Sequence, residues 1–157
     1  MDPYATHLPP LARALTLFRG PVLEIGIGHY SSRLIRALCR DRITSIENNL
    51  AWQKTLGLRG EIFRSPWKGH TPPPLTHFDV VFVDGDADER ARWVLEMLPR
   101  CRALVLHDSN PELDHIYHHL DPLSAARYSW TYNRVYPHTT VASMCEDVGR
   151  LFGDLNE

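Results

Sequence analysis

The stretch PVLEIGIGHYS at residues 21–31 places a short apolar run directly before two glycines and a serine. The apolar run predicts a buried strand over residues 21–26. Ser31 or Ser32 then suits the N-cap of a helix over residues 31–40. A strand, a glycine turn and a helix in this order form the first half of a β–α–β unit.

Strands and helices continue to alternate on both sides of this stretch. Further strands are predicted at residues 42–47, 61–64, 78–83 and 102–106. Helices are predicted at residues 4–18, 49–57, 87–98 and 111–120. The proline-rich stretch 65–77 is expected to be a loop, and two late β-type segments, about 127–136 and 139–145, predict an antiparallel hairpin. The alternation therefore predicts an α/β fold: a Rossmann-like doubly wound sheet, mostly parallel, with a C-terminal antiparallel hairpin.

Length and composition limit what the protein can be. The 157 residues give room for one domain, which we expect over 1–157, with a leading helix in 1–19, a core in 20–145 and a tail in 146–157. The net charge of −2 gives no strong signal for nucleic acid, and no stretch approaches the roughly 18 apolar residues of a membrane span. Three widely spaced cysteines argue against a disulfide framework. We expect a cytoplasmic protein with a small-molecule partner, and leave open whether it forms a homo-oligomer.

Glycines and acidic residues follow the predicted strands, where open parallel sheets bind their ligands. The first strand is followed by Gly26 and Gly28, at which backbone can approach a ligand closely. Glu47 ends the second strand 21 residues after Gly26, the position of a carboxylate that accepts hydrogen bonds from ribose hydroxyls. Asp84 and His107 end the two later apolar strands. This pattern predicts a nucleoside-binding site.

The glycine pattern also bears on which nucleoside is bound. A dinucleotide site has the pattern G-x-G-x-x-G, but Ser31 stands at the third glycine position here. Glu24, two residues before the first glycine, would repel phosphates and would suit an ammonium or sulfonium charge. An NAD-dependent oxidoreductase therefore stays only as an alternative.

Four segments resemble class I S-adenosylmethionine-dependent methyltransferases. Residues 22–28 (VLEIGIG) look like their motif I, and residues 45–47 (SIE) look like their ribose-binding motif. Residues 78–86 (FDVVFVDGD) and 103–108 (ALVLHD) are similar to a small-molecule O-methyltransferase branch, although Ala87 replaces the histidine of its V-D-G-D-H segment. The resemblance implies methyl transfer from S-adenosyl-L-methionine to a small-molecule acceptor, with a hydroxyl group expected. Because the short stretch before residue 78 leaves little room for a substrate lid, a non-catalytic nucleoside-binding or assembly module of the same fold stays an alternative.

The resemblance implies roles for individual residues. The positions expected at the cofactor are Glu24, Gly26, Gly28, Tyr30, Ser31, Glu47, Asn48, Ser65, Trp67 and Asp84. Glu47 would hold the ribose, Ser65 or Trp67 would meet the adenine, and Asp84 would face the methionine amino group or a metal. The catalytic candidates are His107, as a general base, and Asp108. Asp84 and Asp108, with Asn110 or Asp86, would be the oxygen ligands if Mg²⁺ assists the reaction.

Three charged or polar clusters have structural explanations that the sequence also supports. Residues 109–112 (SNPE) fit a capping box at a helix start. The run of charges over residues 86–92 is expected to be an exposed helix start. A solvated helix face is expected for Asp114, His115, His118 and His119, with a metal shared by His115 and His119 as the alternative.

Overall fold

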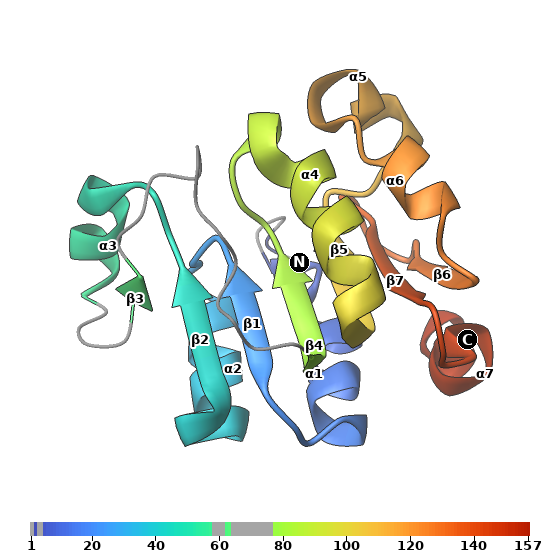
Figure 1. Ribbon diagram of the computed structural model, residues 1–157, viewed down its shortest axis with the longest axis horizontal. Helices are drawn as coiled ribbons and strands as arrows, with labels where there is room; N and C mark the ends of the chain where they lie inside the picture. The colour runs from blue at the N-terminus through green and yellow to red at the C-terminus, as the bar shows by residue number, and fades with distance from the viewer. Residues whose placement is uncertain (1, 3–4, 58–61, 64–76) are drawn as a thin grey trace.

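Seven strands form one sheet in the computed structural model, which describes residues 2, 5–57, 62–63 and 77–157 (Figure 1). The strands are β1 (Val22–Ile25), β2 (Ile43–Ile46), β3 (Ile62–Phe63), β4 (Phe78–Val83), β5 (Cys101–His107), β6 (Tyr128–Tyr132) and β7 (Thr139–Ser143). The α-helices are α1 (Leu8–Leu17), α2 (Ser31–Cys39), α3 (Leu50–Leu56), α4 (Ala87–Met97), α5 (Asp114–Tyr117), α6 (Leu120–Ser124) and α7 (Val148–Phe152).

The strand order is β3-β2-β1-β4-β5-β7-β6. The first five strands of the chain pair in parallel, with Val22 of β1 opposite Ile43 of β2 and Val80 of β4. Strand β7 lies between β5 and β6 and is antiparallel to both. The predicted α/β fold, with its mostly parallel sheet and C-terminal antiparallel hairpin, is therefore confirmed. Because the chain winds outward from β1 and then crosses to β4, a crevice is expected beyond the carboxyl ends of β1 and β4.

Helices cover both faces of the sheet, and the alternation of side chains along β1 shows why. Leu23 is completely buried in the cluster that includes Trp93 of α4. The preceding residue, Val22, points to the opposite face of the sheet and is buried with Leu11 of α1 and Ile35 of α2. Figure 1 shows α4 on one face and α1 with α2 on the other. Burying each such apolar side chain stabilises the fold by about 1.5–3 kcal/mol, so both layers hold the sheet in place.

Two predicted helix starts are capped differently in the structure. The N-cap of α2 is Tyr30, which makes no side-chain capping bond, so the prediction of Ser31 or Ser32 as the N-cap is wrong. Ser32 lies within the helix, and its Oγ accepts the Gly28 amide at 3.0 Å. Asn110 precedes the turn at Pro111–Leu113 but makes no capping bond either. Its side-chain oxygen accepts the His138 amide at 2.7 Å, which fixes the β5 exit to the start of β7. The expected capping box over residues 109–112 is therefore wrong.

The predicted helix over residues 111–120 is broken into short pieces. His118 has a left-handed backbone conformation with φ of 48°, which ends α5 before α6 begins. His119 is completely buried, so the expectation of a solvated face is wrong at this residue. The break also means that His115 and His119 do not share one continuous helix.

The two ends of the chain are packed onto the sheet. Pro9 and Pro10 lie in the first turn of α1, where the missing amide hydrogens of proline cost nothing. At the other end, Val148 and Phe152 of α7 are completely buried, so residues 146–157 are part of the packed fold. In the described part of the chain, no helix has both the length and the apolar character needed to span a membrane.

Candidate functional site

A cavity of about 700 Å³ lies at the carboxyl ends of β1, β4 and β5. Its walls include Ile27 and Gly28 of the glycine loop, Trp52 of α3, the ends of β4 and β5, and His7 before α1. A volume of this size is within the range of roughly 300–1,000 Å³ that small-molecule and cofactor sites occupy. The cavity is where the strand order predicts a ligand site.

The glycine loop after β1 requires glycine at position 26. Gly26 has a φ of +86°, and a Cβ added there would collide with the carbonyl oxygen of Asp84. Only glycine adopts this conformation without strain and lets the β1 and β4 exits approach each other so closely. The Gly26 amide donates to the carbonyl of Ile46 at 2.9 Å, which brings the loop beside the end of β2.

Glu24 lies beneath this loop and is completely buried. Its two carboxylate oxygens accept hydrogen bonds from Ser32 Oγ at 2.7 Å and Ser45 Oγ at 2.8 Å. Ser32 in turn accepts the Gly28 amide, so the chain of bonds sets the position of the loop. Burial raises the pKa of Glu24 to about 7, although the serine hydroxyls oppose the rise. Glu24 therefore supports the cavity floor and, within the described residues, is not among those that line the cavity.

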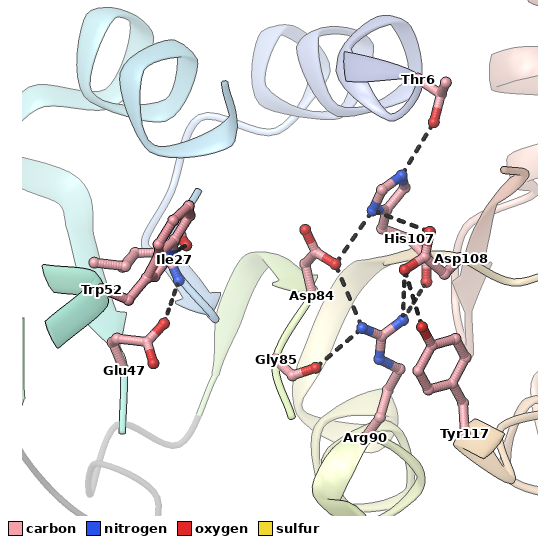
Figure 2. Close-up of polar contacts among 10 residues, drawn as sticks. All are labelled: Thr6, Ile27, Glu47, Trp52, Asp84, Gly85, Arg90, His107, Asp108 and Tyr117. Atoms are coloured by element: carbon pink, nitrogen blue, oxygen red, sulfur yellow. Dashed lines mark hydrogen bonds and ion pairs between the residues drawn. The ribbon is translucent and has the colours of Figure 1, made fainter. Parts of the chain in front are cut away.

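Glu47 and Trp52 hold the other side of the glycine loop (Figure 2). Glu47 accepts the Ile27 amide at 3.1 Å and the Asn49 amide at 2.7 Å, one at each carboxylate oxygen. The indole nitrogen of Trp52 donates to the Ile27 carbonyl at 2.7 Å. These bonds fix the orientation of an acidic and an aromatic side chain beside Gly28. No cofactor role follows for Trp52 from the sequence alone; the structure places it in the first turn of α3, beside the glycine loop.

A buried arginine connects the acidic ends of β4 and β5. Arg90 of α4 is only 4% exposed and lies 3.4 Å from both Asp84 Oδ1 and Asp108 Oδ2 (Figure 2). It also donates to the carbonyls of His107 and Gly85, each at 3.0 Å, and lies 4.0 Å from the centre of the Tyr117 ring. The expected exposed helix start is therefore wrong at Arg90. Its spacing from Trp93, Val94 and Met97 is the pattern that places it on the buried face of α4.

His107 is held on both sides of its ring. Its Nε2 lies 3.0 Å from Thr6 Oγ1, and its Nδ1 lies 3.2 Å from Asp84 Oδ1 (Figure 2). Burial by itself would raise the pKa of Asp84, but the contacts with His107 and Arg90 outweigh it and hold the pKa below its usual value. Asp108 has a positive φ of 53°, a conformation that aspartate tolerates, and the turn it makes carries its carboxylate toward Arg90.

No protein-family model matches the chain, and no curated protein matches it in sequence. Solved structures match it in fold. The O-methyltransferase TomG from Streptomyces achromogenes, in complex with S-adenosylmethionine, is 18% identical with a TM-score of 0.56, and the match covers 88% of this chain and 77% of that one. An O-methyltransferase from Bacillus cereus, in complex with S-adenosylhomocysteine, is 15% identical with a TM-score of 0.56, over 87% and 77% of the two chains. A precorrin-6y C5,15-methyltransferase from Geobacter metallireducens is 18% identical with a TM-score of 0.57, over 85% of each chain.

This chain has the class I methyltransferase fold. Within that fold, Gly26, Gly28, Glu47 and Asp84, which the resemblance assigned to the cofactor, come together around one end of the sheet. Tyr30 lines the cavity and donates to Asp2 Oδ2 at 2.7 Å.

The remaining predicted cofactor residues have other positions. Ser31 is completely buried, below the glycine loop. Asn48 is exposed and lies 3.5 Å from Asp86 Oδ2. Ser65 and Trp67, the candidates for the adenine contact, lie outside the described residues.

The oxygen ligands expected for Mg²⁺ do not form an open site in this class I fold. Arg90 binds both Asp84 and Asp108, so a positive charge already lies between the two carboxylates. Asn110 is completely buried and its side-chain oxygen is used by the His138 amide. Asp86 is exposed and directed to Asn48. The described residues therefore do not fit a magnesium ion held by Asp84, Asp108 and Asn110 or Asp86.

No role follows for His7 from the sequence alone, whereas the fold places it at the cavity wall. It is 2% exposed, and its ring centre lies 4.6 Å from that of His107. Burial, followed by the nearby His107, lowers the pKa of His7 to about 4. The imidazole is therefore neutral at physiological pH. Because His7 lies in the leading segment, far in sequence from the residues that follow the strands, no sequence pattern indicates that it lines the cavity.

Proposed function

We propose that the protein is an S-adenosylmethionine-dependent methyltransferase that acts on a small-molecule acceptor carrying a hydroxyl group. The observation that supports this function is a cavity lined by Gly28 and Trp52 on one side and by Asp84, His107 and Asp108 on the other. Glu47 is not among the described residues that line this cavity, but it accepts the amide of Ile27, which does line it. A nucleoside-binding side and an acidic side thus share one cavity in a fold whose solved neighbours include methyltransferases.

The cofactor half of the proposal rests on Glu47 and Trp52. Each oxygen of Glu47 accepts one backbone amide and has a second lone pair, which a ribose hydroxyl can use. Trp52, fixed by its bond to Ile27, offers an aromatic surface to the adenine ring. Glu24 acts by positioning the loop rather than by touching the cofactor, since its oxygens are used by two serines.

S-Adenosylmethionine, when bound, supplies a methyl group already activated by the sulfonium charge. The protein has to exclude water and align the acceptor with that methyl group. Asp84 and Asp108 place negative charge at the strand ends, which favours a cationic ligand in the cavity. An attacking hydroxyl must also lose its proton. Because both nitrogens of His107 are already engaged, we assign the acceptor contact to Asp108 and a positioning role to His107.

Calorimetry with S-adenosylhomocysteine tests the cofactor half directly. We expect the wild-type protein to bind, and Glu47→Gln to weaken binding by about 1–3 kcal/mol through the lost charge-assisted hydrogen bonds. Glu157→Gln, an exposed residue at the end of the chain, is the matched control. Binding of NADH in place of S-adenosylhomocysteine would support the oxidoreductase alternative. Cofactor binding without methyl transfer to any hydroxyl acceptor tested would support the non-catalytic module.

A further inference from the structure

The imidazole of His7 is buried against the cavity with nothing to bind. Neither ring nitrogen has a hydrogen-bond partner among the described residues, although the side chain is only 2% exposed. Its neighbours are aromatic rings: Phe82 at 5.0 Å and His107 at 4.6 Å between ring centres. A buried polar group without a partner is unfavourable, so its presence at a cavity wall points to a bound ligand.

Two further ligand-type side chains lie beside His7. One donor atom from each of His7, Asp84 and His107 lies within 4.8 Å of the other two. His107 Nδ1 and Asp84 Oδ1 are 3.2 Å apart. Arg90 approaches the same oxygen of Asp84, and the hydrogen bonds and ion pairs of Asp84 with the described residues are all made by Oδ1 rather than Oδ2. That second oxygen is available to a cation on the cavity side.

We propose that His7, Asp84 and His107 form a binding site for a divalent transition metal such as Zn²⁺. Two imidazoles and one carboxylate are a ligand set that zinc and related metals accept, whereas Mg²⁺ prefers oxygen ligands. The site thus differs from the predicted magnesium site in two of its ligands and in the metal it selects. Zinc holds these ligands at about 2.0–2.2 Å, so small side-chain rotations must draw the three atoms together.

The charges around the cavity favour a divalent ion. Asp84 and Asp108 contribute two negative charges, and Arg90 contributes one positive charge, which leaves 1 − 2 = −1. No lysine or arginine is among the described residues that line the cavity. A divalent cation would neutralise this excess where carboxylates are partly shielded from water.

Thr6 supplies the support that a metal-bound histidine needs. With the proton of His107 on Nε2, that nitrogen donates to Thr6 Oγ1 at 3.0 Å, and Nδ1 is free to bind the metal. This tautomer replaces the one in which Nδ1–H donates to Asp84 Oδ1 at 3.2 Å, so the single ring proton sits on Nε2 and the neutral imidazole loses no proton when the metal binds. Three protein ligands leave a fourth position, which would face the cavity and accept water or an acceptor oxygen. The metal site does not depend on the identity of the nucleoside.

Metal-stripped wild-type protein titrated with Co²⁺ and with Zn²⁺ tests this site. We expect one equivalent of Co²⁺ to give the visible absorption bands of a low-coordinate ion, and Zn²⁺ to displace it. His7→Ala and His107→Ala should each weaken Zn²⁺ binding by at least about tenfold, and Thr6→Val by about tenfold. His77→Ala, an exposed histidine just before β4, is the matched control and should bind as wild type.

Circular dichroism without metal shows whether each variant is folded. Should His7→Ala not fold, imidazole nitrogen NMR of the wild type answers the question, because zinc must shift the His7 and His107 signals together. Zinc binding to wild type only at millimolar concentration, or with undiminished affinity in folded His7→Ala, would overturn the proposal. If the wild type bound Mg²⁺ more tightly than Zn²⁺, and Asp108→Asn lost that Mg²⁺ binding, the zinc proposal would also be overturned. That result would support the predicted magnesium site that includes Asp84 and Asp108. The metal titrations contain no S-adenosylhomocysteine. They can therefore be interpreted even if S-adenosylhomocysteine does not bind and the proposed function fails.

Discussion

Replacing Glu24 by glutamine should change how folding stability depends on pH. The pKa of Glu24 is raised from 4.5 to about 7 in the folded protein, a difference of about 7 − 4.5 = 2.5. Each pKa unit corresponds to about 1.4 kcal/mol, so this group alone contributes a pH-dependent change of about 3 kcal/mol. Between pH 4.5 and 7 the unfolded chain has released the Glu24 proton and the folded chain retains it. Stability therefore falls as pH rises through this window and falls no further from this group above about pH 7.

Glutamine cannot ionise, so Glu24→Gln should lack this fall. The measurement is urea unfolding of the wild type and the variant at several values from pH 4.5 to pH 8. As pH rises through the series, we expect the free energy of unfolding of Glu24→Gln to increase by about 3 kcal/mol relative to that of the wild type. The free energy of unfolding of Glu157→Gln should follow that of the wild type. If the free energy of unfolding changed with pH in the same way for the wild type and Glu24→Gln, the conclusion that burial destabilises the ionised Glu24 carboxylate would be refuted.

Three further substitutions test the packing and the site. Gly26→Ala should lower the free energy of unfolding by about 1–3 kcal/mol, because the residue has a positive φ and its Cβ would meet Asp84; an unchanged melting temperature would contradict this. Arg90→Met should destabilise the protein by about 2 kcal/mol at neutral pH, because two partly buried carboxylates lose their cation. That loss should shrink in strong acid as Asp84, whose pKa is held below its usual value by His107 and Arg90, becomes protonated, and urea unfolding at neutral and acid pH would show it. Trp52→Ala should weaken S-adenosylhomocysteine binding by about 1 kcal/mol in calorimetry, and equal affinity would remove Trp52 from the adenine site.

The sheet could be predicted because its strands carry strong local signals. The apolar runs that end at Gly26 and Asp84 are too short for typical helices and are bounded by turn residues, which favours strands. Both runs are strands in the structure. Glu47 and Gly26 were placed together by their spacing along the chain, and the Gly26–Ile46 hydrogen bond shows that their segments are adjacent. Local sequence therefore predicted the fold and the position of the glycine loop beside the end of β2.

The side of the cavity formed by Asp84, His107 and Asp108 depends on contacts between residues that are distant in sequence. Charge alone made Arg90 look exposed, but inside the fold its two terminal nitrogens meet two carboxylates and two carbonyls. His7 lies 100 positions before His107, and only the path of the leading segment brings the two rings together. His119 is buried because His118 ends the preceding helix, a backbone choice that no residue pattern marks.

A crystal structure of the protein with bound S-adenosylhomocysteine is the most direct measurement of the proposed function. We expect the ribose hydroxyls within hydrogen-bonding distance of Glu47, the adenine beside Trp52 and the sulfur directed toward the ends of β4 and β5. A ligand bound on another surface, or a cavity that stays closed to it at saturating concentration, would contradict the methyltransferase assignment.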